Sequence, residues 1–135
     1  METVNEILFQ QQPRRLLSAW PEETVLAATQ RMVENGVGAL LIMDGERLVG
    51  IFTERDVLRR VVAEERLPSE VRVGDVMSGD VACCTRDTSI DEVENLMRQQ
   101  RIRHIPVVDE IGTVTGILSI GDVNAYRTSK QEVQI

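Results

Sequence analysis

The sequence predicts an α+β fold (α/β sandwich-like) in which two β-α-β-β-α repeats are related by a pseudo-twofold axis. The first observation is a sequence motif, here called the phrase, that occurs twice, at 50–57 and 116–123. It consists of an apolar run, a hydroxyl residue, and an aspartate three positions after the hydroxyl residue. The second is that the elements predicted around each phrase follow the same order. The third is size: a half of about sixty residues buries too little surface to be stable alone, so the halves should pack together.

In the first half, the apolar spacing alternates between helical and strand patterns. The segments 4–8 and 25–33 carry apolar side chains three or four positions apart, which predicts helices, and Gly36 is typical of a left-handed cap. Asp44 and Gly45 form a strong tight-turn signal between two apolar runs. The predicted elements are a helix at 4–8, a strand at 16–20, a helix at 25–33, hairpin strands at 39–43 and 48–52, and a helix at 53–62.

The second half repeats this order. Met97 lies 65 positions after Met32, and Asp109 lies 65 positions after Asp44. The repeated phrase is offset by 66 positions, because the second hairpin turn is one residue longer. Chance explains one such match but hardly all of them, which indicates an internal duplication. The predicted elements are a helix at 73–77, a strand at 81–85, a helix at 90–97, hairpin strands at 105–108 and 114–118, and a helix at 119–126.

These elements divide the chain into two repeats and two connecting segments. We place the first repeat at 3–63 and the second at 73–127. The segment 64–72 is polar, contains Pro68 and lacks apolar periodicity, which is typical of a linker. The end of the chain, 128–135, is predicted to be a flexible tail.

The net charge of −7 argues against several classes of partner. Nucleic acid and anionic membrane surfaces both attract a basic face, which an acidic chain does not offer. The longest apolar run, 37–43, is far too short to span a bilayer, and the N-terminus lacks the pattern of a signal peptide. Cys83 and Cys84 are adjacent, so on a strand they point to opposite faces and share neither a disulfide nor a metal. We therefore expect a reduced, cytoplasmic, soluble protein with no nucleic-acid or membrane partner.

Two hydroxyl–aspartate pairs, Thr53 with Asp56 and Ser119 with Asp122, mark the start of a helix in each repeat. The first explanation is structural, because a hydroxyl residue followed three positions later by an acid has the spacing of a capping box. The second explanation is ribose recognition, because a carboxylate accepts both donors of a vicinal diol. The two roles are compatible, since the hydroxyl can cap the helix while the aspartate faces a ligand.

A basic cluster interrupts this acidic chain. Its members are Arg98, Arg101, Arg103 and His104. The first two are explained by a solvated helix end, where cations also favour the helix dipole. The last two precede a buried strand, where either a solvated end or a phosphate-binding role explains them. The first half has Gly38 and Ala39 at the matching positions, so the two repeats present unequal chemistry.

The two phrases, together with residues 103–109 (RHIPVVD), resemble the cystathionine-β-synthase (CBS) domain family in its tandem arrangement, the Bateman module. The resemblance covers roughly residues 3–127 and leaves no segment for an attached enzyme, so it implies a stand-alone pair. It implies a regulatory module that binds adenosine-containing ligands in clefts between the two repeats. It also implies a homodimer, in which a second copy covers the apolar residues Val57, Leu58, Val61 and Val62.

The resemblance also implies roles for particular residues. It places the ribose at Thr53, Asp56, Ser119 and Asp122, and the phosphates at Arg103 and His104. It places the adenine in clefts flanked by Val37, Gly38, Ala39, Ile102 and Pro106, each of which is also explained as core. The implied ligand is AMP, ADP or ATP acting as a regulator, with no obligatory cofactor. The protein that such a module would regulate is not indicated by the sequence.

Catalysis is not expected. No P-loop is present, and Leu41 stands where a dinucleotide fingerprint needs its third glycine. One histidine and two adjacent cysteines make no metal set, and nothing supports a nucleophile–base–orienter trio. Two alternatives stay open: a structural or dimerisation module with vestigial or empty clefts, and a sensor of NAD or S-adenosylmethionine, which share the ribose.

Overall fold

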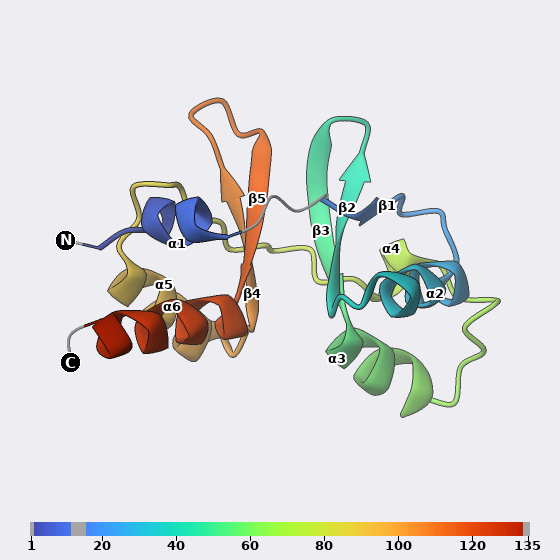
Figure 1. Cartoon of the computed structure of the whole chain (residues 1–135). Helices are drawn as coiled ribbons and strands as arrows, with labels where there is room; N and C mark the ends of the chain where they lie inside the picture. The colour runs from blue at the N-terminus through green and yellow to red at the C-terminus, as the bar shows by residue number, and fades with distance from the viewer. Residues whose placement is uncertain (1, 12–15, 134–135) are drawn as a thin grey trace. The chain divides into compact units, whose positions relative to one another are not determined.

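The computed structural model describes residues 2–11 and 16–133, with side chains up to residue 130. The chain forms two compact units, which are not the two halves of the sequence. The central unit comprises Leu16–Val81, and the terminal unit combines Met1–Arg15 with Ala82–Ile135. Both units contain helices and a small sheet, so the α+β class is confirmed (Figure 1).

The central unit is a three-stranded sheet with helices packed on it. The strand order is β1-β2-β3, with β1 parallel to β2 and β2 antiparallel to β3. Thr24 caps α2 by accepting a hydrogen bond from the Ala27 amide (3.1 Å), and Gly36 ends this helix with a φ of 63°. The elements are β1 (Ser18–Ala19), α2 (Val25–Asn35), β2 (Ala39–Asp44), β3 (Arg47–Thr53), α3 (Glu54–Val57), the π-helical turn η1 (Leu58–Val62) and α4 (Val73–Val76).

The terminal unit repeats this arrangement around a two-stranded antiparallel sheet, β4-β5. Ser89 caps its first long helix by accepting a hydrogen bond from the Glu92 amide (3.1 Å). The elements are α1 (Val4–Gln10), α5 (Ile90–Gln100), β4 (His104–Val108), β5 (Val114–Ser119) and α6 (Ile120–Val133). The last helix therefore continues past residue 127, where the sequence placed the end of the second repeat.

The prediction of a strand at 81–85 is wrong, because only a single parallel bridge forms there, at Cys84. In the central unit the Leu41 amide donates to the Leu17 carbonyl (3.1 Å) and extends the β1–β2 ladder. Pro106 occupies the position of Leu41 in β4 and has no N–H to donate. Cys84 still donates its amide to the Pro106 carbonyl (2.9 Å), so the pairing is reduced to one residue.

Each half of the sequence contributes its leading helix to the unit formed by the other half. The Val73 amide at the start of α4 donates to the Glu23 carbonyl (2.8 Å), and the Val4 amide at the start of α1 donates to the Thr88 carbonyl (2.9 Å). Glu23 and Thr88 precede the equivalent helices α2 and α5, so the same contact is made in both units. Figure 1 shows α4 with α2, and α1 with α5 and α6. The duplication is therefore present in the packing as well as in the sequence.

The segment 64–72, interpreted from sequence as a linker, is attached to the central unit. The Pro68 carbonyl accepts a hydrogen bond from the Leu26 amide (3.0 Å), and the Val71 carbonyl accepts one from the Val25 amide (2.8 Å). The side chain of Val71 is 5% exposed and packs in the central core. This segment therefore covers the start of α2.

Each unit has its own core of mainly aliphatic side chains. Phe52 is the large aromatic side chain of the central core, and Tyr126 is that of the terminal core. The central core is formed by Ala19, Val25, Ala28, Met32, Leu40, Ile42, Phe52, Val61, Val71, Val73 and Val76. The terminal core is formed by Val4, Ile7, Cys84, Ile90, Val93, Met97, Ile105, Val107, Leu118, Val123 and Tyr126.

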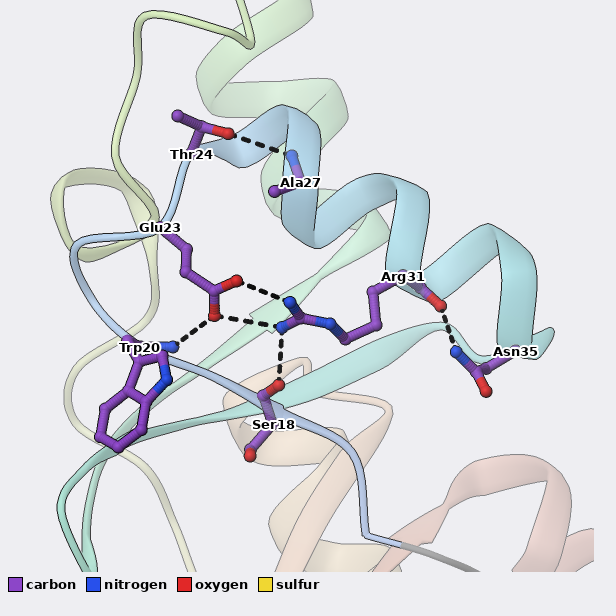
Figure 2. Close-up of polar contacts among 7 residues, drawn as sticks. All are labelled: Ser18, Trp20, Glu23, Thr24, Ala27, Arg31 and Asn35. Carbon is purple, nitrogen blue, oxygen red and sulfur yellow. Dashed lines mark hydrogen bonds and ion pairs between the residues drawn. The ribbon is translucent and has the colours of Figure 1, made fainter.

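A polar network ties β1 to α2 in the central unit (Figure 2). Glu23 accepts hydrogen bonds from the Trp20 amide (2.8 Å) and from the Arg31 guanidinium (2.6 Å). The other terminal nitrogen of Arg31 donates to the Ser18 carbonyl in β1 (2.8 Å). The hydrogen bond from Arg31 is the main cause of the lowered pKa of Glu23, because the guanidinium stabilises the ionised carboxylate.

Candidate functional site

The hydroxyl–aspartate pair of the central unit, here the first corner (residues 53–56), lies where β3 ends and α3 begins. Thr53 has an extended backbone (φ −123°, ψ 164°), which turns its side chain toward the first helical turn. Its amide donates to Oδ2 of Asp56 (2.9 Å), and the Asp56 amide donates to Oγ1 of Thr53 (3.3 Å). This reciprocal pair is a capping box, which confirms the structural explanation of the spacing.

The Asp56 carboxylate has further contacts on both oxygens. The Thr53 hydroxyl donates to Oδ2 (3.2 Å), and the Ser78 hydroxyl donates to Oδ1 (3.5 Å). Nε of Arg60 lies 3.9 Å from Oδ1, while Nη1 of Arg60 donates to two backbone carbonyls at the end of α4. Asp56 is 7% exposed and is the one charged residue classed as buried in the part of the chain that the structure describes.

The segment that follows α4 packs against β3 beside the first corner. Ser78 and Ile51 exchange two backbone hydrogen bonds of 3.0 Å. Gly50 permits this approach, since a Cβ at that position would lie 2.9 Å from the Ser78 carbonyl oxygen and 2.5 Å from Sδ of Met77. The close packing at Gly50 therefore holds the Ser78 hydroxyl near Asp56.

The pair in the terminal unit, here the second corner (residues 119–122), lies where β5 ends and α6 begins. The Ser119 amide donates to Oδ2 of Asp122 (2.8 Å), and the Asp122 amide donates to Oγ of Ser119 (3.1 Å). Both residues are half-buried. The position equivalent to Ser78 is Phe9, which is still inside α1 and is 87% exposed. The second corner thus has the same capping box but a different neighbour at this position.

The start of β4 places two basic residues beside the second corner. His104 pairs with Ser119 across the β4–β5 ladder, and the Ile120 amide donates to the Arg103 carbonyl (2.8 Å). Arg103 is exposed, and His104 is half-buried. Arg98 lies on α5, where its guanidinium donates to a side chain of the same helix (3.1 Å). The fold therefore brings Arg103 and His104 to the second corner and leaves Arg98 on the helix surface.

The positions of the first corner that match Arg103 and His104 are Gly38 and Ala39, and an acidic side chain, that of Glu54, lies beside them. Ala39 pairs with Thr53 across the β2–β3 ladder, and the Glu54 amide donates to the Gly38 carbonyl (3.1 Å). The Glu54 carboxylate lies over Gly38, since a Cβ on Gly38 would be 2.6 Å from its Oε1. Ala39 is 8% exposed, and Val37 is half-buried against the central core.

The expected adenine-lining residues of the terminal unit lie next to the second corner. Ile102 is half-buried against the terminal core. It lies two positions before His104, the residue that pairs with Ser119 across the β4–β5 ladder. Pro106 is buried within β4, with its missing N–H on the side of Cys84. Both residues therefore contribute to packing in their own unit.

Sequence reasoning missed three residues at the first corner: Ser78, Arg60 and Glu54. Ser78 is 22 positions from Asp56, so no local pattern links the two. Arg60 follows Asp56 by one helical turn, and that spacing was an available signal. For Glu54 the available signal was the comparison between repeats, because the second repeat has Ile120 at this position.

Two features are absent from the residues that the structure describes: a metal-ligand cluster and a membrane-spanning helix. Within the described ranges, no three His, Cys, Asp or Glu side chains are grouped so that they could hold a metal ion. In the same residues, no helix has both the length and the apolar character needed to cross a bilayer. Cys84 is buried, and burial is the main cause that raises its pKa to about 12, whereas Cys83 is exposed.

Comparison with known proteins identifies the family. The model of the CBS domain matches residues 13–63 and 73–128, which is most of the chain, and the chain therefore belongs to the CBS domain family. CBS domain pairs are regulatory, ligand-binding modules. The mitochondrial CBS domain-containing protein CBSX3 of Arabidopsis thaliana is 37% identical over 107 residues, which are 76% of this chain and 52% of that protein. The chain thus spans about half the length of this curated relative.

Two solved structures illustrate the shared fold. A protein with CBS domains from Burkholderia ambifaria matches with a TM-score of 0.91 and 37% identity, covering 96% of both chains. The CBS domain protein PAE2072 from Pyrobaculum aerophilum, solved in complex with AMP, matches with a TM-score of 0.77 and 24% identity. This second likeness covers 89% of this chain and 88% of the other, and shows the fold.

Proposed function

We propose that this chain is a regulatory module that binds an adenosine nucleotide (AMP, ADP or ATP) at a hydroxyl–aspartate corner of its CBS repeats. The observation that carries the proposal is the second corner, where Ser119 and the half-buried Asp122 lie beside Arg103 and His104. A carboxylate accepts the two hydroxyls of a ribose, and a guanidinium donates a fork of hydrogen bonds to phosphate. The AMP complex of the P. aerophilum protein supports this choice of ligand.

The proposal assigns the adenine to the apolar residues that flank each corner: Val37, Gly38 and Ala39 in the central unit, and Ile102 and Pro106 in the terminal unit. The chain would act by binding, and a separate protein would receive the signal. NAD and S-adenosylmethionine also contain adenosine, so the same residues would accept them. A structural module with empty clefts would bind none of these compounds.

The experiment is a thermal-shift panel on the full chain with adenosine, AMP, ADP, ATP, NAD and S-adenosylmethionine, and with GMP as the matched control. A ligand that binds only the folded state at about 100 times its Kd raises the free energy of unfolding by about 2.7 kcal/mol. We expect the adenine nucleotides to raise Tm and GMP to leave it unchanged. No shift with any adenosine compound would contradict the proposal and favour a structural module.

We also propose that the chain pairs with a second copy through η1. Leu58 and Val62 lie one turn apart on η1 and are 62% and 58% exposed, so a second copy packed on this face would remove both side chains from water. Val57 and Val61, expected from sequence on the same face, pack instead against the central core. Sedimentation should show a dimer at micromolar concentration, and Leu58→Glu should dissociate it. Leu67→Glu, at an exposed site outside η1, is the control.

A further inference from the structure

Two neighbouring helices of the central unit carry large apolar side chains on their exposed surfaces. α2 packs beside α3, which η1 continues (Figure 1). On α2, Leu26 and Val33 lie two turns apart and are 40% and 75% exposed. On η1, Leu58 and Val62 are exposed in the same way. These four residues are here called the α2–η1 face.

The equivalent helices of the terminal unit, α5 and α6, are polar at all four positions. The positions that match Leu26, Val33, Leu58 and Val62 are, in that order, Asp91, Arg98, Asn124 and Thr128. All four are exposed. Arg127 on α6 joins the two helices through ion pairs with Asp91 (2.7 Å) and with Glu94. The terminal unit therefore presents hydrated charges on the surface where the central unit presents apolar side chains.

This difference indicates which surface of a second copy would cover the α2–η1 face. Packing the face on α5 and α6 of a second copy would take Asp91, Arg98 and Arg127 out of water against apolar side chains, and buried charges are costly without new partners. Packing it on the α2–η1 face of a second copy would remove apolar side chains from water on both sides. Such a pairing uses one patch of each chain, so it closes at two chains.

The charges beside the face are complementary under a twofold axis. Both charged residues of η1 are arginines: Arg60 donates to the carbonyls at the end of α4, and Arg59 is exposed. On α2, Arg31 is bound to Glu23, and the exposed charged residue is Glu34. Two η1 segments laid together would bring arginines together, whereas η1 laid on α2 brings Arg59 near Glu34 of the second copy.

We propose that two copies pair through their central units about a twofold axis, with η1 of each copy packed on α2 of the other. This inference rests on the pairing already proposed and adds to it the surface of the second copy that η1 meets. It assigns no part in the contact to the exposed surface of α5 and α6. It does not depend on which nucleotide the chain binds.

The first test is sedimentation of variants of the full chain at micromolar concentration. We expect Val33→Glu and Val62→Glu each to raise the dimer Kd about tenfold or more, because the new carboxylate would be buried against apolar side chains. The matched controls lie at the equivalent positions of the terminal unit. Arg98→Glu and Thr128→Glu should change the dimer Kd by less than about twofold. Thermal melts check that each variant is folded.

The second test exchanges the two charges across the interface. Arg59→Glu and Glu34→Arg should each weaken the dimer, because like charges would then meet at both ends of the twofold contact. A mixture of the two variants should form a dimer again, since each Glu would face an Arg. Sedimentation of each variant alone and of the equimolar mixture measures this.

The outcomes separate this inference from the pairing on which it rests. A wild-type chain that stays monomeric would overturn both. If Arg98→Glu or Thr128→Glu dissociates the dimer as strongly as Val33→Glu, or if Val33→Glu and Val62→Glu leave its Kd unchanged, the pairing of central units is wrong and a dimer of another arrangement remains. A mixture of the two charge variants that stays monomeric would overturn the placement of η1 on α2.

Discussion

At the first corner, the carboxylate of Asp56 is 7% exposed and lies among Thr53, Ser78 and Arg60. At the second corner, the carboxylate of Asp122 accepts the same capping hydrogen bond, from the Ser119 amide, but is half-buried. The two turns therefore share their local structure and differ in what surrounds them. One strand-to-helix turn, duplicated, is therefore buried to different depths in the two units.

The difference arises outside the repeated phrase. Ser78 comes from the segment after α4, and its approach depends on Gly50. At the equivalent Gly116, a Cβ would lie 3.6 Å from the Leu8 side chain, which is an ordinary contact. Arg60 sits one turn beyond the phrase, where the second repeat has Tyr126 in place of a cation. A motif of four residues thus does not determine how deeply its carboxylate is buried.

The largest effect on stability should come from removing the carboxylate of the first corner. Asp56→Ala leaves the Thr53 amide and Arg60 without their acceptor in a buried place, which should cost about 3 kcal/mol. Asp122→Ala removes a half-buried cap and should cost about 1 kcal/mol. Urea denaturation of both variants measures the difference. Equal losses in the free energy of unfolding would mean that the two carboxylates contribute equally to stability.

The next effect should come from the two glycines. A Cβ at Gly50 would meet the Ser78 carbonyl oxygen at 2.9 Å, so Gly50→Ala should destabilise the protein by about 2 kcal/mol through overpacking. At Gly116 the nearest atom would be 3.6 Å away, an ordinary contact, so Gly116→Ala should change stability by less than about 0.5 kcal/mol. Thermal or urea unfolding compares them directly. A Gly116 variant that loses as much as the Gly50 variant would show that the second corner is packed just as closely.

A smaller effect should follow from making the central unit more like the terminal one. In the terminal unit, Leu96 occupies the position equivalent to Arg31. Arg31→Leu removes the hydrogen bond to Glu23 and should lower the free energy of unfolding by about 1 kcal/mol near neutral pH. The folded pKa of Glu23 lies below its usual value of 4.5, so its stabilisation is present above that value and is lost as pH falls. The difference between wild type and variant should therefore shrink in acid. A difference that persists unchanged at pH about 3 would point to packing instead.

The smallest effect concerns the two cysteines, which occupy the positions of Ser18 and Ala19 in the terminal unit. Burial raises the pKa of Cys84 to about 12, so its thiolate is negligible at pH about 8. Iodoacetamide should therefore label Cys83, which is exposed, much faster than Cys84, and without a change in Tm. Peptide mass spectrometry measures both rates. Rapid labelling of Cys84 in the folded protein would show that the bridge to β4 opens readily.

Much of the fold was predictable from the sequence, because the duplication and the hairpins are encoded locally. The turn at Asp44 and Gly45 and the caps at Thr53 and Ser119 are examples that the structure confirms. The exchange of leading helices was not predictable, since the apolar spacing of α1 and α4 shows which face is buried but not which half buries it.

The candidate site was predictable to a lesser degree. The ladders place His104 opposite Ser119 and Ala39 opposite Thr53, as the aligned repeats required. The contact of Ser78 with Asp56 joins residues far apart in the sequence and needed the fold. The assignment of ribose, phosphate and adenine to particular residues stays a prediction.

The most direct test of this account is a crystal structure of the full chain grown with saturating AMP. The account predicts AMP at the second corner, with its ribose hydroxyls in hydrogen-bond contact with Asp122 and its phosphate at Arg103. A structure with no AMP at either corner, or with AMP bound away from both Asp122 and Arg103, would contradict it.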